Sequence, residues 1–244
     1  MCIRDRFSIV GLAGIGPGSH VVEAGAGSGA LTCFLLTAVG PTGHVTSHEI
    51  RPEFADVARR NVTRWFVGEP DNWSLQMGDI AESRPQHPSA DALVLDMLAP
   101  WECLDVAART LRPGGRLIGY VATTTQLSRL AESMRADGRW TEPRATESMV
   151  RTWHLEGLAV RPDHRMIAHT AFLIVSRRLA DGERLPPRRR RPAPGAYGPE
   201  YSGPRPPDVA LEPVPTQDQD EGRPPAPDDD GGRSAVTGRN DPPD

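Results

Sequence analysis

Short runs of apolar and β-branched residues alternate along the chain with longer segments whose apolar residues recur at helical spacing. The short runs are predicted strands and occupy residues 20–24, 44–49, 73–77, 92–96 and 116–122. The segments between them are predicted helices over residues 30–39, 52–65, 100–111 and 124–137. Because strands and helices alternate, we expect an α/β fold with a parallel, doubly wound sheet.

Two further apolar runs, residues 149–158 and 170–178, bring the predicted sheet to seven strands. The segment 159–169 between them has no helical period. We therefore expect the last two strands to form an antiparallel C-terminal hairpin.

The composition changes sharply near residue 180. Of the 25 prolines, 15 lie from Pro186 onward, where four consecutive arginines from Arg188 and an acidic run at 228–230 replace aliphatic residues. Such a segment buries too little apolar surface to offset the entropy of ordering it. We predict one folded domain over residues 8–180 and a disordered tail over residues 181–244. The opening residues 1–6 show neither helical periodicity nor a capping pattern.

Charge, cysteine and hydropathy patterns narrow the class of protein. The net charge of −4 gives no global basic field of the kind that nucleic-acid-binding domains carry. Cys2, Cys33 and Cys103 form no CxxC pair and no cluster with metal-ligand spacing, so we predict no metal site and a reducing, cytoplasmic compartment. No run approaches the roughly 18–20 apolar residues of a membrane span, so we expect no membrane association.

The segment EAGAGSGA, residues 23–30, lies between the first predicted strand and its helix. Glycines there permit a tight turn and let a ligand approach the backbone, while free N–H groups at a helix start favour an anionic group. Gly25, Gly27 and Gly29 have the spacing GxGxG, not the GxGxxG of nicotinamide-binding proteins. This spacing, with Glu23 two residues ahead, resembles the first motif of S-adenosylmethionine-dependent methyltransferases. Packing glycines are the alternative.

Carboxylates follow three of the next predicted strands. Glu49 can accept hydrogen bonds from both hydroxyls of a ribose, an argument that holds equally for a nicotinamide cofactor. Asp79 is either an acceptor for the amino group of adenine or a turn residue, and Phe54 packs either on the ligand or in the core. Asp96 ends the fourth strand at the edge where open α/β sheets bind ligands. The alternative for Asp96 is a cap on the helix that follows.

From about residue 21 to residue 178 the chain resembles the catalytic domain of bacterial tRNA (adenine-58-N1)-methyltransferases. Beyond the glycine segment, the resemblance is carried by EIRPE at 49–53, VLDMLAPWE at 94–102, YVATTTQLSR at 120–129 and LAVRPDHRMIAHTAFLIVSRR at 158–178. It implies a Rossmann-like methyltransferase sheet that binds S-adenosylmethionine. The cofactor-binding residues it implies are Glu23, Gly25, Gly27, Ser28, Gly29, Ala30, Leu31, Glu49, Phe54, Asp79 and Asp96.

The resemblance also implies a reaction, the methylation of N1 of adenine 58 in the T-loop of tRNA, on a base extruded from its stack. N1 carries an in-plane lone pair, so its attack needs no strong base, and the product ring is cationic. Asp96 would then be the catalytic residue, because its carboxylate can accept a hydrogen bond from the adenine N6 amino group and stabilise the developing positive charge. Related amino-methylating enzymes have an Asp/Asn-Pro-Pro-aromatic motif here, whereas in this chain the proline is displaced to Pro100 and followed by Trp101.

The chain also departs from these relatives. They carry a small N-terminal β domain and, shortly before the glycine segment, a sequence resembling YPKDA, and nothing here matches either. We therefore expect the chain to be incomplete at its N-terminus and to lack part of the target-base pocket. The relatives form tetramers, so a homotetramer is expected.

Three other functions are compatible with parts of the pattern. One is another class I methyltransferase, acting on isoaspartyl protein or on a small molecule. A second is a non-catalytic tRNA-binding subunit, but such partners lose the cofactor glycines and the catalytic aspartate, which are present here as Gly25, Gly27, Gly29 and Asp96. A nicotinamide-dependent reductase is a more distant alternative.

Overall fold

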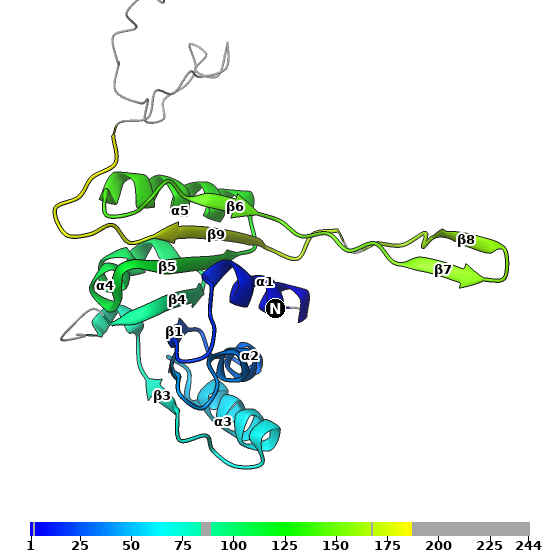
Figure 1. Ribbon diagram of the computed structural model, residues 1–244, viewed down its shortest axis with the longest axis horizontal. Helices are drawn as coiled ribbons and strands as arrows, with labels where there is room; N and C mark the ends of the chain where they lie inside the picture. The colour runs from blue at the N-terminus through cyan, green and yellow to red at the C-terminus, as the bar shows by residue number, and fades with distance from the viewer. Residues whose placement is uncertain (2, 84–88, 167, 187–244) are drawn as a thin grey trace, which may run out of the picture. The chain divides into compact units, whose positions relative to one another are not determined.

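The computed structural model describes residues 1, 3–83, 89–166 and 168–186, which form a seven-stranded sheet and a two-stranded hairpin (Figure 1). The sheet has the order β3-β2-β1-β4-β5-β9-β6. Its strands are β1 (His20–Ala24), β2 (His44–Glu49), β3 (Trp73–Met77), β4 (Ala90–Asp96), β5 (Leu111–Val121), β6 (Arg144–Thr146) and β9 (Phe172–Arg177). Strands β1 to β5 pair with one another in parallel, whereas β9 is antiparallel to both β5 and β6. The predicted doubly wound α/β sheet with an antiparallel C-terminal part is confirmed.

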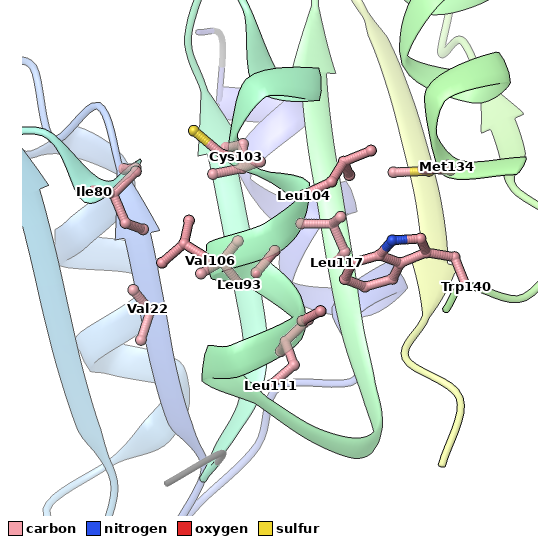
Figure 2. Close-up of a cluster of buried hydrophobic side chains, with 14 of the residues drawn as sticks. Val22, Ile80, Leu93, Cys103, Leu104, Val106, Leu111, Leu117, Met134 and Trp140 are labelled. Atoms are coloured by element: carbon pink, nitrogen blue, oxygen red, sulfur yellow. The ribbon is translucent and has the colours of Figure 1, made fainter. Parts of the chain in front are cut away.

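Helices pack on both faces of this sheet. They are α1 (Ile3–Ala13), α2 (Ala30–Val39), α3 (Pro52–Phe66), α4 (Leu104–Thr110) and α5 (Thr124–Asp137), with short 3-10 turns η1 (Ile80–Glu82) and η2 (Pro100–Cys103). Alternate residues of β4 enter two cores because successive side chains of a strand point to opposite faces. Leu93 joins the core under α4 and α5 (Figure 2), as does Leu95. Ala92 and Val94 join the core under α1, α2 and α3.

Helix α1 is an element that the sequence pattern did not indicate. Ile9 and Ala13 are buried against the sheet, and Tyr120 of β5 donates a hydrogen bond of 3.2 Å to the buried carboxylate of Asp5. Arginines flank Asp5 in this helix, and its sequence is only weakly amphipathic. The sequence therefore offers neither a capping residue nor a clear apolar stripe from which the helix could be predicted. Tertiary contacts with β5 and α2 supply its stability instead.

The predicted sixth strand, residues 149–158, is wrong as a member of the main sheet. The edge strand there is β6 (Arg144–Thr146), whose residues are all exposed and so leave no apolar pattern in the sequence. Residues 149–158 instead contribute β7 (Trp153–Glu156), which pairs with β8 (Ala159–Pro162) from the segment predicted as a connection. Gly157, at φ 52°, begins the two-residue turn between them, where a positive φ is required.

The apolar side chains of this hairpin explain the error. Trp153 is 55% exposed and Leu155 is 75% exposed, so a run of apolar residues that predicted a buried strand lies on the surface. The sequence pattern shows only that the segment is apolar. It does not show whether another part of the protein covers the apolar side chains.

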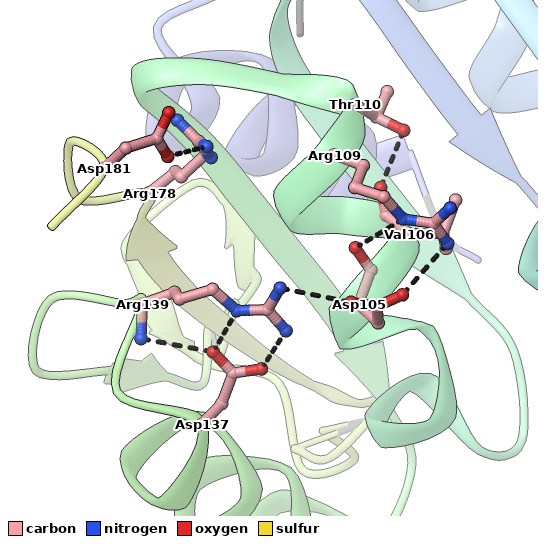
Figure 3. Close-up of polar contacts among 8 residues, drawn as sticks. All are labelled: Asp105, Val106, Arg109, Thr110, Asp137, Arg139, Arg178 and Asp181. Atoms are coloured by element: carbon pink, nitrogen blue, oxygen red, sulfur yellow. Dashed lines mark hydrogen bonds and ion pairs between the residues drawn. The ribbon is translucent and has the colours of Figure 1, made fainter. Parts of the chain in front are cut away.

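Ion pairs join the segment after α5 to α4, and hold the segment after β9, at the edge of the sheet where β5 begins (Figure 3). Arg139 donates to the carboxylates of Asp137 and, on α4, of Asp105. These hydrogen bonds raise the pKa of the Arg139 guanidinium above its ordinary value. Arg178, which follows β9, pairs with Asp181 at 2.5 Å. This edge is opposite to the strand ends that carry the candidate site.

Most of the predicted tail, residues 187–244, lies outside the described residues. Within the described residues, no helix has the length and apolar character needed to cross a membrane.

Candidate functional site

The glycine segment forms a loop between β1 and α2, and its backbone conformation explains its composition. Gly25, Gly27 and Gly29 have φ angles of 95°, 53° and 73°, in the region that favours glycine. A Cβ atom on Gly25 would lie 2.2 Å from the carbonyl oxygen of Asp96, and one on Gly29 would lie 3.0 Å from the backbone of Ala58 in α3. These two glycines therefore permit close packing, as the alternative interpretation has it. Gly27 has no neighbour closer than 3.9 Å to such an atom and leaves room for a ligand.

The end of β2 holds this loop through hydrogen bonds. The N–H groups of Gly25 and Ala26 donate to the carbonyl of His48 at 3.0 and 3.2 Å, and the N–H of Gly27 donates to Glu49 Oε2 at 2.8 Å. The other oxygen, Oε1, accepts from the backbone and the side chain of Arg51. Glu49 thus joins the loop after β1 to the turn after β2.

The carboxylate of Glu49 is 2% exposed, and two opposing effects act on its pKa. Burial raises the pKa, while the hydrogen bonds from Gly27 and Arg51 and the charge of Arg51 lower it, and the net shift is downward. Glu49 is therefore ionised over the whole neutral range. Its Oε2 atom keeps an acceptor position besides the Gly27 bond, which a ribose hydroxyl can use.

Glu23 lies beneath the loop and is fully buried. Its Oε1 atom accepts hydrogen bonds from the hydroxyls of Thr32 and Ser47, and Ser47 in turn accepts one from the indole of Trp73. Its Oε2 atom is buried and has no hydrogen-bond partner in the part of the chain that the structure describes. Burial raises the pKa of Glu23 to about 7, and the charges of Asp96 and Glu49 act in the same direction. Thr32 and Ser47 are site residues that the sequence analysis missed, because a hydroxyl in a strand or helix carries no motif.

Asp96 ends β4 beside the loop, and its carboxylate is partly buried. Within the described part of the chain no donor lies within hydrogen-bond distance of it. The helix-cap interpretation is wrong, because Ala99 and Cys103 occupy the N-cap positions of η2 and α4. Burial raises the pKa of the Asp96 carboxyl above its usual range, and the positive charge of the N-terminal amino group of Met1 opposes this shift. An acceptor with no internal donor, at the ligand edge of the sheet, is suited to bind an amino group.

The remaining predicted site residues differ in how far they are exposed to solvent. Asp79 caps η1 by accepting from the N–H of Ala81 at 2.9 Å, so the turn role applies to one of its two oxygens. Phe54 is 36% exposed, and the guanidinium carbon of Arg51 lies 3.9 Å from the centroid of its ring. Phe54 therefore lies outside the core. Ser28 is exposed at the tip of the loop, and Ala30 and Leu31 begin α2.

A cavity of about 500 Å³ borders the loop on the side of α1 and α3. It is lined by Ser28, Gly29 and Ala30 together with Arg6, Cys33, Phe34, Asn61, Arg64 and Trp65. None of the predicted carboxylates lines it, so we place the chemistry at the strand ends, where Glu49 and Asp96 meet the loop. Across the described residues, no group of three or more histidine, cysteine, aspartate or glutamate side chains is arranged to hold a metal ion.

Comparison with known proteins matches this chain to methyltransferases. The family described as tRNA methyltransferase complex GCD14 subunit matches residues 4–169. The tRNA (adenine(58)-N(1))-methyltransferase TrmI of Thermus thermophilus is 35% identical over 175 residues, which cover 72% of this chain and 68% of that protein. Both matches extend well beyond the cofactor-binding half of the sheet.

Two solved structures resemble the fold over nearly the same span. A SAM-dependent O-methyltransferase from Thermotoga maritima superposes with a TM-score of 0.70 at 30% identity, covering 75% of this chain and 68% of that one. The tRNA (m1A58) methyltransferase TrmI from Aquifex aeolicus superposes with a TM-score of 0.67 at 25% identity, covering 74% and 70%. The names of the two enzymes differ in the atom that receives the methyl group.

Proposed function

Because the chain belongs to the family of the tRNA methyltransferase complex GCD14 subunit, we propose that it transfers a methyl group from S-adenosylmethionine to N1 of adenine 58 in tRNA. The observation that carries the proposal is the carboxylate of Asp96, which ends β4 next to the glycine loop and has no hydrogen-bond donor among the described residues. The Thermus and Aquifex enzymes, named for this reaction, support N1 of adenine as the acceptor atom over an oxygen.

The residues of the site fit S-adenosylmethionine. The cofactor supplies a methyl group activated by a sulfonium centre. Gly27 leaves open space over the loop, and the first turn of α2 at Ala30 presents N–H groups that lack intrahelical acceptors and suit a carboxylate. Glu49 Oε2 has an acceptor position for a ribose hydroxyl, and the second oxygen of Asp79 has one for the adenine amino group.

Asp96 acts on the substrate base. Its carboxylate accepts a hydrogen bond from the N6 amino group of adenine, which orients N1 toward the cofactor side of the site. As the ring acquires positive charge, a carboxylate already in place stabilises it without reorganisation, and this favours the transition state over the bound substrate. Since N1 carries its own lone pair, no residue has to remove a proton from it.

Two finer properties belong to the same proposal and rest on the family resemblance. The enzyme assembles as a homotetramer, and it works in the cytoplasm, where its tRNA substrate is. Sedimentation velocity across a range of protein concentrations tests the first property, and a single species with the mass of a monomer would contradict it.

Nucleoside mass spectrometry tests the reaction directly. The chain is incubated with S-adenosylmethionine and an unmodified tRNA transcript, and the digest is expected to contain 1-methyladenosine. A transcript with guanosine in place of adenine 58 is the matched control and should stay unmethylated. Methyl transfer to an isoaspartyl peptide with none to tRNA would establish the protein-methyltransferase alternative. Binding of tRNA with neither methylation nor binding of S-adenosylmethionine would establish a non-catalytic subunit.

A further inference from the structure

The segment that carries the β7–β8 hairpin leaves the sheet at the same edge as Asp96. Strand register aligns Asp96 with Tyr120 of β5, Tyr120 with Leu173 of β9, and Leu173 with Thr146 of β6. These four residues form one row across the sheet. Glu147 follows the row at the end of β6, and His169 precedes it before β9, so the two residues flank the hairpin-bearing segment 148–168 at its base.

His169 connects this base to the end of β5. Its Nδ1 atom lies 2.6 Å from Glu147 Oε1, and its Nε2 atom lies 2.9 Å from the carbonyl oxygen of Ala122. Both partners are acceptors, so the ring satisfies both only as the doubly protonated imidazolium. The hydrogen bond to Glu147, followed by that to Ala122, raises the pKa of His169 above its ordinary value.

The hydrogen bonds continue from Ala122 to the loop after Asp96. The N–H of Ala122 donates to Gln126 Oε1 at 3.2 Å, and Gln126 Nε2 donates to the carbonyl of Leu98 at 3.0 Å. Gln126 is also the N3 residue of the capping box that begins α5, with Thr123 as the N-cap. One turn later, Arg129 covers the ring of Trp101 at 4.2 Å. The start of α5 therefore holds both the backbone and the aromatic ring of the loop that follows Asp96.

We propose that His169 and Gln126 are positioning residues for methyl transfer, and that they hold the loop after Asp96 in place from the base of the hairpin. The inference rests on the proposed function, because its readout is the methylation of tRNA. The loop needs such support, since Leu98 is 84% exposed two residues after the catalytic carboxylate. The chain of hydrogen bonds from Leu98 through Gln126 and Ala122 to His169 restricts the motion of this loop relative to Asp96.

This chain of hydrogen bonds depends on the positive charge of His169. The charged group paired with its ring is Glu147, and the Phe172 ring of β9 lies 4.8 Å away between centroids. The next residue, Thr170, contacts Arg4 and Asp5 of α1. Because folding raises the pKa of His169, the pair is complete below the ordinary histidine pKa and is lost as pH rises through the raised value. Turnover should therefore decline on the alkaline side.

Steady-state methylation of the tRNA transcript by the full chain, measured from pH 6 to pH 9, tests this. Glu147→Gln removes the carboxylate, so the alkaline decline of kcat should move to lower pH. His169→Gln should lower kcat roughly 10-fold or more at pH 6.5, in line with the effect of small displacements on reacting groups, and should abolish the decline. Neither variant should change the KM for S-adenosylmethionine.

Gln126→Glu separates positioning from helix capping. Glutamate at this position still accepts from the N–H groups of the capping box, but it cannot donate to the Leu98 carbonyl. The variant should keep the melting temperature and lose kcat. The matched controls are His154→Gln and Glu156→Gln, which break a histidine–glutamate pair of 3.3 Å within the hairpin and should retain the wild-type pH profile.

The outcomes distinguish the two proposals. A wild-type chain that leaves tRNA unmethylated overturns the proposed function, and the inference falls with it. An active wild type whose kcat and pH profile survive in Glu147→Gln, His169→Gln and Gln126→Glu overturns the inference alone. Hydrogen exchange gives a readout without turnover: amides in segments 97–103 and 120–126 should exchange faster in Gln126→Glu than in the wild type, and unchanged rates would also overturn it.

Discussion

The carbonyl oxygen of Asp96 occupies the space that a side chain on Gly25 would need, since a Cβ atom built there would lie 2.2 Å away. The glycine loop and the end of β4 are therefore packed against each other without a gap. The glycine thereby fixes the distance between this loop and the backbone of Asp96, in addition to permitting the turn.

Gly25→Ala should abolish detectable binding of S-adenosylmethionine in calorimetry and lower the melting temperature. The added methyl group must displace either the loop or the end of β4, and both carry the site. Gly40→Ala is the matched control, because Gly40 also has a positive φ, 63°, but no atom lies within 4 Å of the added Cβ. That control, at φ 63° and ψ −172° in a region open essentially only to glycine, should destabilise the fold by about 1–3 kcal/mol from backbone strain alone and leave affinity intact. Equal effects of the two changes would show that the contact with Asp96 is unimportant.

Asp96→Asn should lower turnover on tRNA by about 2–4 kcal/mol of barrier, the scale on which one preorganised electrostatic partner acts. Asparagine has nearly the same shape but no charge to stabilise the cationic ring. The control is Asp91→Asn at the other end of β4, where Asp91 pairs with Arg112 at 2.7 Å far from the loop, and its turnover should be that of the wild type. Full activity of Asp96→Asn with normal cofactor affinity would refute the catalytic role.

Much of this site could be predicted from the sequence because its residues stand at strand ends. Once β1, β2 and β4 are recognised from their apolar runs, parallel pairing brings the residues that follow them to one edge, and Gly25, Glu49 and Asp96 meet there. Such residues need no long-range information beyond the order of strands.

The rest of the site depends on contacts that leave no local pattern. Glu23 was predicted to bind the cofactor, but the environment of its carboxylate comes from hydroxyls on α2 and β2. The chain of hydrogen bonds from His169 to Leu98 joins residues 71 positions apart in the sequence through a backbone carbonyl and a glutamine. Periodicity cannot report either arrangement, because neither depends on the apolar character of a segment.

Glu49→Ala should weaken the binding of S-adenosylmethionine by about 1.5–3 kcal/mol, the range for hydrogen bonds to a charged group. The change removes the acceptor for a ribose hydroxyl and also releases the N–H of Gly27. Arg51→Ala is the control, since it removes a donor to Glu49 Oε1 and leaves the 2.8 Å bond from Gly27 to Oε2. Calorimetry should show a much smaller loss for Arg51→Ala. Unchanged affinity in Glu49→Ala would remove the ribose assignment.

Glu23→Gln should change how stability depends on pH. Burial raises the pKa of Glu23 from 4.5 to about 7, so the folded protein keeps a proton that the unfolded chain has released between these values. Stability contributed by this group is present at low pH and is lost as pH rises from about 4.5 to 7, by on the order of 3 kcal/mol in total. Glutamine cannot ionise, and its oxygen can still accept from Thr32 and Ser47, so the variant should lack this loss.

The measurement is the free energy of unfolding of both proteins in urea, taken at several pH values, with the difference between them plotted against pH. Taking the difference cancels the titrating groups that do not interact with Glu23, whereas Asp96 and Glu49 interact with it. The wild type should be the more stable protein near pH 4.5, because glutamine places an unpaired amide group where Oε2 is buried. Its advantage should shrink as pH approaches 7. A flat difference for Glu23→Gln would mean that Glu23 is ionised throughout.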